Sequence, residues 1–597
     1  MNLMTDLRTD VAAALQARLG ADVDLTSLTL QTTREEFEGE YTLVVFPWIK
    51  LARTKPEALA EDLGHWLTEH SDKVAGYNVV KGFLNLSLKD DYFAQGLFEA
   101  YHTPNWGTAP KNGRRVMVEY SSPNTNKPLH LGHVRNNLLG WSVSRILEAT
   151  GTEVVMANLV NDRGIHICKS MVAWLHFGQG ATPESTGVKG DHFVGDYYVR
   201  YDKAYREQVK ELEAKGLSED EAKKQAPILL EAQELLRKWE ANDPETRALW
   251  EKMNGWVYAG FDETYKALGV HFDKVYYESQ TYLLGKKIVE EGLQRGVLQR
   301  HDDGSVWVDL RDEGLDEKLL LRSDGTSVYM TQDLGTAVER FREYQLDDIV
   351  YVVGNEQEYH FQVLRKLLGR LGYVWSDRIF HLSYGMITLP EGKMKSREGT
   401  VVDADDLIEE LIGEATRIGE EQGKAADLDS DAAADIYRQV GLGALKYFML
   451  KVDPAKGMLF NPKESVDFNG NTGPFIQYTC ARAQSILNKL PDLTKAIEGL
   501  SQPILGTPFD RYERAVLRLL HEYERVIAEA AVKLSPAVVV NYVYDLACRF
   551  NQFYHECPIA RESDPKLQQQ RLLLTQATLR VLRSALLLLG IETPKQM

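Results

Sequence analysis

The chain has 597 residues and a formal net charge of −18 at pH 7, so it is long enough for about three domains. Its composition, 44% hydrophobic and 26% charged, is ordinary for a globular protein, and the acidic balance does not by itself indicate nucleic-acid binding. No apolar run reaches 18 residues, so we expect no membrane span, and the start of the chain lacks a signal-peptide pattern. The four cysteines form no CxxC pair, which argues against a disulfide framework or a zinc site and favours a cytoplasmic location.

Residues 1–105 are predicted to form a small α/β module. Two helical patterns alternate with short apolar runs typical of strands, and Pro56 stands near the start of the second helix, where proline is favoured. No catalytic pattern occurs in this stretch. We interpret it as a binding or packing module.

The next stretch, residues 116–137, predicts a strand, a polar loop and the start of a helix. The loop brings His130, Gly132 and His133 to the helix start, where free N–H groups and the helix dipole attract anions. Glycine allows a ligand to approach closely, and two imidazoles can donate to phosphate oxygens. Alone, HxGH is weak evidence, because a capped helix with two exposed histidines has the same pattern.

A second strand in residues 151–164 completes a βαβ unit, so residues 106–403 are predicted to form a parallel-sheet domain whose ligands lie at the carboxyl ends of the strands. Charged helical sequence over about 180–255 indicates an insertion, which we expect to be mostly solvated. The alternation of strand and helix patterns then resumes. Near the ends of its strands stand Tyr329, Asp333, Gln357 and His360. For Asp333, a helix cap is an equally good interpretation.

A basic loop follows the last predicted strand, within residues 378–400. It contains Lys393, Met394 and Lys395, and it would neutralise a leaving pyrophosphate if it lay beside a nucleotide. From residue 404 onward the apolar spacing is helical. We divide this part into a helical connector, 404–460, and an all-helical domain, 461–597.

Six blocks, in order, resemble the arginyl-tRNA synthetase family of the class I aminoacyl-tRNA synthetases. The resemblance covers almost the whole chain and is weakest over residues 180–250. The blocks are VEYSSPNTNKPLHLGHVRN (118–136), YMTQDL (329–334), YVVGNEQEYHF (351–361), GALKYFML (443–450), GPFIQYTCARAQSIL (473–487) and LLLLGIETPKQM (586–597).

The resemblance implies a Rossmann-type α/β catalytic core, an N-terminal module that touches the tRNA elbow, and a DALR-type helical domain that binds the anticodon. It implies a two-step reaction: L-arginine and ATP, with Mg²⁺, give arginyl-adenylate and pyrophosphate, and the arginyl group then moves to the terminal adenosine of tRNA(Arg). Family members usually need bound tRNA before they activate arginine, and the resemblance favours a monomer.

The resemblance also assigns roles to residues. Those implied to contact ATP are His130, Gly132, His133, His360, Lys393 and Met394. Those implied to surround arginine are Glu119, Asn124, Glu278, Tyr329, Asp333 and Gln357, with Glu278 the loosest match. Carboxylates suit this substrate because they bind the planar guanidinium through paired hydrogen bonds. No protein metal ligands are expected, because Mg²⁺ would be bound through phosphates and water.

The basic loop departs from the usual class I pattern, K-M-S-K-S. Here Ser396 stands where the second lysine is expected, and Lys395 comes one residue early. Many arginyl enzymes share this gap and carry a lysine before HxGH. We therefore expect Lys127 to stabilise the phosphates, with Lys395 as the alternative.

Three other interpretations stay open on the sequence. Another class I synthetase, such as the cysteinyl enzyme, is disfavoured by the lack of clustered Cys and His. A small adenylate-forming enzyme of the pantothenate synthetase kind would leave the C-terminal helices without a purpose. An inactive paralogue that only binds tRNA is disfavoured because the family's site residues are all present: His130, Gly132, His133, Asp333, Gln357 and Lys393.

Overall fold

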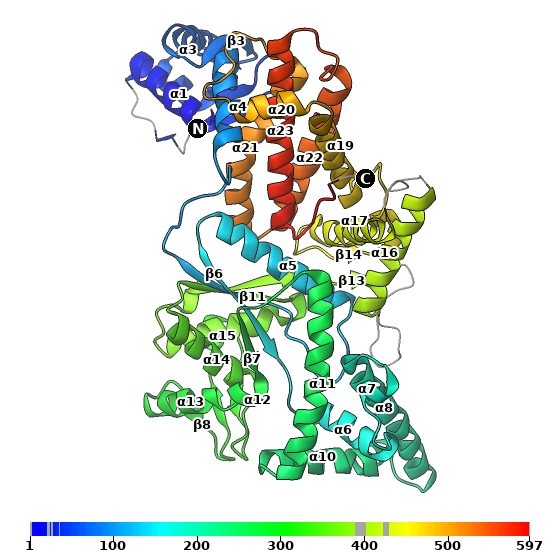
Figure 1. The fold of residues 1–597 in the computed structure, drawn as a ribbon. Helices are drawn as coiled ribbons and strands as arrows, with labels where there is room; N and C mark the ends of the chain where they lie inside the picture. The colour runs from blue at the N-terminus through cyan, green and yellow to red at the C-terminus, as the bar shows by residue number, and fades with distance from the viewer. Residues whose placement is uncertain are drawn as a thin grey trace.

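The computed structural model describes residues 3–20, 24–25, 28–34, 36–388, 402–421 and 429–595. In Figure 1 the N-terminal module, in blue, lies against the C-terminal helices, in orange and red, at one end of the molecule. The parallel sheet and the inserted helices form the other end. Helix α5 lies between the two ends and contacts helices of the C-terminal domain.

The N-terminal module is a four-stranded antiparallel sheet with helices. Its strand order is β1-β2-β4-β3. The elements are α1 (Leu3–Leu19), β1 (Leu30–Thr32), β2 (Tyr41–Val44), α2 (Ile49–Ala52), α3 (Pro56–His70), β3 (Val74–Val80), β4 (Phe83–Leu88) and α4 (Asp90–His102). Helix α3 begins at Pro56, as expected for a residue that has no N–H to lose at the first helical position.

The large sheet has five parallel strands in the order β12-β11-β5-β6-β7. β5, which precedes HxGH, is therefore the central strand. The sheet and its connections comprise β5 (Arg115–Glu119), α5 (Leu131–Ala149), β6 (Glu153–Val160), α6 (Ile165–Phe177), β7 (Lys274–Tyr277), α12 (Glu278–Thr281), α13 (Leu284–Gln294), α14 (Tyr329–Tyr344), β11 (Asp348–Gly354), α15 (Glu358–Arg370) and β12 (Ile379–Tyr384). A small antiparallel sheet, β8 (Gln299–Arg300), β9 (Val306–Val308) and β10 (Lys318–Leu321), lies between α13 and α14 in the chain.

The insertion consists of α7 (Pro183–Thr186), α8 (Gly190–Ala214), α9 (Glu219–Gln225), α10 (Pro227–Glu240) and α11 (Pro244–Leu268). These residues are helical, and the first part of α8 is an exception to the expectation that most of this stretch is solvated. Phe193, Val194, Tyr197 and Tyr201 are buried there. They belong to the main hydrophobic core, so this helix is built into the domain.

The C-terminal part is helical apart from one short strand that returns to the core. Its elements are α16 (Ala404–Glu421), α17 (Ser430–Leu450), β14 (Met458–Leu459), α18 (Pro462–Ser465), α19 (Gly473–Lys489), α20 (Pro491–Glu498), α21 (Arg511–Lys533), α22 (Pro536–Glu556) and α23 (Pro565–Leu588). β14 pairs in parallel with β13 (Ile387–Thr388). The chain before α16 also joins the core: the Leu131 N–H donates to Val402 O at 3.0 Å, and the Ala404 N–H donates to Leu129 O at 3.0 Å.

The two ends of the chain meet in a polar and apolar interface. The Arg514 guanidinium on α21 contacts the carboxylates of Glu40 at 2.8 Å and Asp90 at 2.6 Å. The Trp106 indole N–H donates to Leu520 O at 2.9 Å. The predicted fold class, a parallel-sheet core with a small N-terminal α/β domain and a helical C-terminal domain, is confirmed. Among the described helices, none is long and apolar enough to cross a membrane.

Candidate active site

The turn after β5 is held by asparagines from neighbouring elements. Ser121 and Ser122 have φ values of 75° and 47°, a conformation that non-glycine residues adopt only when their surroundings enforce it. The Ser121 N–H donates to Asn136 Oδ1 at 2.5 Å, and the Ser122 N–H donates to Asn158 Oδ1 at 3.1 Å. The Asn136 amide also donates to Val352 O at 2.7 Å. Contacts to α5, β6 and β11 therefore fix the path of the chain toward HxGH.

The two histidines of HxGH form a capping box at the start of α5. The Gly132 N–H donates to His130 Nδ1 at 3.1 Å, and the His130 N–H donates to His133 Nδ1 at 3.2 Å. Burial lowers the pKa of His130 to about 4 and that of His133 well below its usual range. Both rings are therefore neutral, and since each Nδ1 accepts a hydrogen bond, each proton lies on Nε2. The pair offers two N–H donors without a net charge.

Gly132 is packed closely against the motif's own first histidine. A Cβ at this position would lie 3.0 Å from His130 Cε1 and 3.1 Å from its Nδ1. The sequence prediction gave this glycine the role of making room for a nucleotide. The structure adds that the His130 ring itself occupies the nearest space.

Two adjoining cavities lie at the carboxyl edge of the sheet. The first, of about 470 Å³, is bounded by the loop before α5 and by α8 of the insertion. The second, of about 490 Å³, is bounded by the chain after β6 and by the start of α12. They share four lining residues: Asn124, Asn126, His166 and Tyr329. Tyr329 is 73% exposed, as expected for a side chain that stands in open space between the cavities.

The first cavity carries the candidate anion-binding groups. Lys127 and His130 line it, and burial lowers the pKa of Lys127. His192 and Asp196 of α8 also line it, and so does Asp403. A half-buried ammonium beside two imidazole donors suits a phosphate chain.

The second cavity contains Glu278. Burial raises the pKa of this carboxyl to about 7, while nearby Arg163 and a hydrogen bond with Gln332 lower it in part. Arg163 itself pairs with Glu240 at 2.9 Å. A partly buried carboxyl with a raised pKa would gain from a cationic ligand, because the ligand's charge would compensate its desolvation.

Glu119, predicted to touch the amino acid, is not at either cavity. It is 5% exposed and forms an ion pair with Arg340 of α14, which is 1% exposed. Arg340 lies over the Tyr276 ring, 4.7 Å from its centroid, and contacts the Tyr351 hydroxyl at 3.3 Å. The Glu119 carboxylate is therefore paired with a protein guanidinium, and its direct contact with the amino acid stays a prediction.

The other predicted site residues divide into three groups. Asp333 and His360 contact each other at 2.6 Å between Oδ2 and Nε2, beside the cavities but not among their lining residues. Gln357 is exposed in the turn after β11 and does not line either cavity. Lys393, Met394 and Lys395 lie outside the described residues.

Sequence reasoning missed several residues that shape the site. Asp162, 1% exposed, accepts hydrogen bonds from the Ser279 N–H at 2.8 Å and the Tyr258 hydroxyl at 3.0 Å, and so positions the segment that starts with Glu278. The polar sequence at the end of β6 was the available signal for Asp162. His192 had no signal, since its charged surroundings were interpreted as a solvated insertion.

Family models match three successive parts of the chain. The tRNA synthetases class I (R) catalytic domain matches residues 100–461, the DALR anticodon binding domain matches 476–597, and the arginyl tRNA synthetase N terminal domain matches 5–88. Among solved structures, Thermus thermophilus arginyl-tRNA synthetase superposes with a TM-score of 0.77 at 26% identity, covering 100% of both chains.

Curated relatives agree with these matches over their full length. The arginine–tRNA ligase of Phocaeicola vulgatus is 54% identical, and that of Amoebophilus asiaticus is 50% identical, each alignment covering 100% of both chains. This level of identity over the whole length, together with the three ordered domains, shows the family. The chain belongs to the arginyl-tRNA synthetases, the class I arginine–tRNA ligases.

Proposed function

We propose how the residues of the two cavities perform the reaction of this arginine–tRNA ligase. The enzyme joins L-arginine to ATP to form arginyl-adenylate and pyrophosphate, and then transfers the arginyl group to the 3′-terminal adenosine of tRNA. The observation that carries the proposal is the pair of adjoining cavities. One offers cationic and N–H donors, the other offers a carboxyl with a raised pKa, and both share Asn124 and Tyr329.

The second cavity would hold the arginine side chain. Glu278 would accept hydrogen bonds from the guanidinium, with the Tyr329 hydroxyl and the Asp333 carboxylate nearby. Asn124, which lines both cavities, would hold the polar groups of the amino acid's backbone. Gln357, in the turn after β11, would also hold polar groups of the amino acid. Glu119 would act through Arg340, as a positioning residue.

The first cavity would hold the ATP phosphates. His130 and His133 would donate their Nε2 protons to phosphate oxygens as charge develops in the transition state. Lys127 would add a full positive charge, strengthened by its partly buried surroundings. His360, held by Asp333, would lie on the adenosine side. Lys393, Met394 and Lys395 remain candidates to complete the phosphate site.

Mg²⁺ is proposed to arrive with ATP. When bound, it would neutralise part of the negative charge on the phosphates. The first cavity has two lining carboxylates, Asp196 and Asp403, and Asp403 already accepts a hydrogen bond from the Asp405 N–H at 2.8 Å. Because Mg²⁺ would keep phosphate oxygens and water in its coordination shell, it would need few oxygen ligands from the protein.

The outer domains are proposed to bind tRNA. The match of residues 476–597 to an anticodon-binding model supports contacts between α19–α23 and the anticodon stem and loop. The N-terminal module would touch the tRNA elbow. A monomer is proposed because α19, α21, α22 and α23 bury their apolar faces in a core within the chain. A cytoplasmic location is proposed because all four cysteines, which lie in the described residues, are unpaired.

Pyrophosphate exchange into ATP tests these roles. We expect exchange that depends on arginine, and exchange only in the presence of tRNA(Arg) if activation is coupled to tRNA binding. Lys127→Ala should lower the exchange rate by about 100-fold or more, because a charge that stabilises the transition state is lost. The control is Lys111→Ala, an exposed lysine, which should leave the rate unchanged.

One pair of results would overturn the lysine assignment. If Lys127→Ala exchanged at the wild-type rate and Lys395→Ala abolished exchange, the phosphate charge would come from the basic loop. Absence of exchange in the wild-type protein, with tRNA binding intact, would identify an inactive paralogue.

A further inference from the structure

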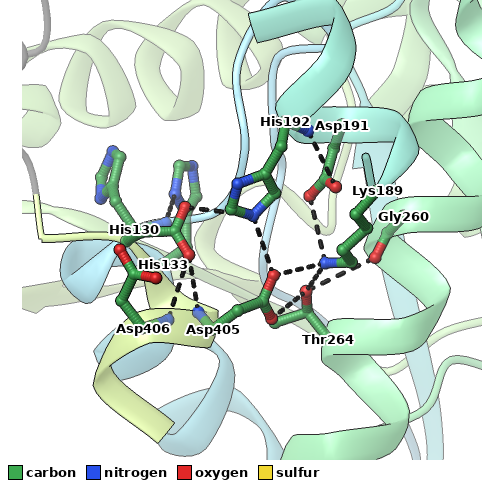
Figure 2. A network of polar contacts seen from close by, with 10 residues as sticks. His130, His133, Lys189, Asp191, His192, Gly260, Thr264, Asp405 and Asp406 are labelled. Carbon is green, nitrogen blue, oxygen red and sulfur yellow. Dashed lines mark hydrogen bonds and ion pairs between the residues drawn. The ribbon is translucent and has the colours of Figure 1, made fainter. Parts of the chain in front are cut away.

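A polar network connects α8 of the insertion, α11 and the start of α16 beside HxGH (Figure 2). The Lys189 ammonium lies 2.6 Å from Asp405 Oδ2, 2.6 Å from Thr264 Oγ1 and 3.4 Å from Asp191 Oδ2. The second oxygen of Asp405 accepts from the Thr264 hydroxyl at 2.8 Å. Asp405 is therefore the centre of the network, and it remains paired even if one partner is removed.

His192 is the member of this network that faces the first cavity. In Figure 2 its ring lies between the His130–His133 pair and Lys189. Its Nε2 is 3.0 Å from Asp405 Oδ2 and 3.4 Å from Asp403 Oδ2. The side chain is 30% exposed and lines the same cavity as Lys127 and His130.

The two nitrogens of this ring have different surroundings. Nε2 is held by carboxylates, whereas Nδ1 has no hydrogen-bond partner among the described residues. The hydrogen bond with Asp405 raises the pKa of His192 to about 9, so both nitrogens carry a proton at neutral pH. A ring that is fixed on one side and open on the other is a preorganised donor, because its orientation costs nothing when a ligand binds.

A divalent ion does not explain the cluster as well. Asp191, His192 and Asp405 bring ligand atoms within 4.8 Å of one another. The Lys189 ammonium, however, already contacts both carboxylates, and the charged form of His192 is not a metal ligand. The cation of this cluster is supplied by the protein.

We propose that His192 is a substrate-binding residue that donates its Nδ1 proton to an oxygen of a nucleotide in the first cavity. The inference rests on the proposed function, which places nucleotide phosphates there. The acceptor belongs either to ATP or to the 3′-terminal nucleotide of tRNA, since both present phosphate and ribose oxygens. The insertion thereby contributes a residue that contacts substrate, in addition to forming a wall of the cavity.

Two substitutions distinguish substrate binding from a structural role. The amide nitrogen of asparagine takes the place of Nδ1, and that of glutamine takes the place of Nε2, because of their different distances from Cβ. His192→Gln should keep the contact with Asp405 and lower kcat/KM by about 10- to 100-fold, the effect of losing a charge-assisted hydrogen bond. His192→Asn should stay within about threefold of the wild type, with Asp405 still held by Lys189 and Thr264.

The substrate whose KM changes identifies the acceptor. An increase in KM for ATP during pyrophosphate exchange assigns the oxygen to ATP, and an increase in KM for tRNA at saturating ATP assigns it to tRNA. A fall in kcat/KM in His192→Asn alone, or an equal fall in both variants, would overturn the proposal and leave a structural role. Normal exchange by the wild type together with an unaffected His192→Gln would also overturn it without affecting the proposed function.

A measurement on the wild type covers the case of a variant that does not fold. In protein labelled with ¹⁵N-histidine, the Nδ1 resonance of His192 should shift on saturation with ATP or with tRNA. A resonance that moves with neither substrate would refute the proposal.

Discussion

Glu119 and Glu278 show how one residue type takes two roles at the edge of one sheet. Glu119 ends β5 and Glu278 directly follows β7, and both were predicted to bind the arginine guanidinium. Glu119 is buried against Arg340, whereas Glu278 lines a cavity and has a pKa of about 7. A buried carboxylate is therefore available to a cationic substrate only where the protein has not already supplied a cation to pair with it.

The largest expected effect is on folding. Glu119→Gln should lower the free energy of unfolding of the catalytic core by about 3–5 kcal/mol, because it leaves the Arg340 guanidinium buried without its counter-charge. Urea denaturation followed by tryptophan fluorescence measures the change. The double variant Glu119→Leu, Arg340→Met should be less destabilised than either single variant, and equal or greater loss would show that the pair is not the cause.

The next effect is on catalysis without a loss of stability. Glu278→Gln should reduce kcat/KM for arginine by about 30- to 1000-fold, the cost of removing one partner of a desolvated charge pair. Steady-state exchange at varied arginine concentration gives the value. Glu290→Gln, an exposed glutamate on α13, is the matched control. A melting temperature that falls as far as in Glu119→Gln would mean that both glutamates are structural.

A smaller effect is expected from the dependence of KM for arginine on pH. A carboxyl with a pKa of about 7 is neutral below that value, so arginine binding must displace its proton. KM for arginine should therefore rise by about tenfold for each pH unit below about 7 and level off above it. Glu278→Gln should lose this dependence. A flat profile in the wild type would place the guanidinium away from Glu278.

The smallest effect comes from an exposed pair on the helix that carries Arg340. Glu339 and Arg342 on α14 are 2.6 Å apart at the surface. Glu339→Gln should change the free energy of unfolding by less than about 0.5 kcal/mol, because solvent screens such pairs. Denaturation under the conditions used for Glu119→Gln gives a direct comparison. A change above 1 kcal/mol would show that burial does not explain the different contributions of the Glu119–Arg340 and Glu339–Arg342 pairs to stability.

Local sequence patterns were sufficient for the architecture. The strand, loop and helix over 116–137 and the change to helices at Ala404 follow from periodicity, which depends only on near neighbours. The role of Glu119 could not be predicted in this way, because its partner Arg340 lies 221 residues away in sequence. Burial of α8 was missed for the same reason: which face of a charged helix is covered depends on elements distant in the chain.

The candidate site was predictable only where its residues share a motif. His130, Gly132 and His133 occupy adjacent positions at one helix start, so the sequence alone places them together. The first cavity is also lined by His192 of the insertion and by Asp403, which follows the undescribed residues 389–401. No single motif connects these segments. Lys393, Met394 and Lys395 lie outside the described residues, so their contribution stays a prediction.

The interface between the two ends of the chain has a consequence for synthesis on the ribosome. Asp90 and Arg514, which contact each other, are separated by 424 residues. At typical elongation rates the N-terminal module therefore waits about 20 to 85 s before its partner helix has been made. During that time the surface that will receive α21 faces the crowded cell, and a nascent-chain chaperone has its greatest opportunity to bind there.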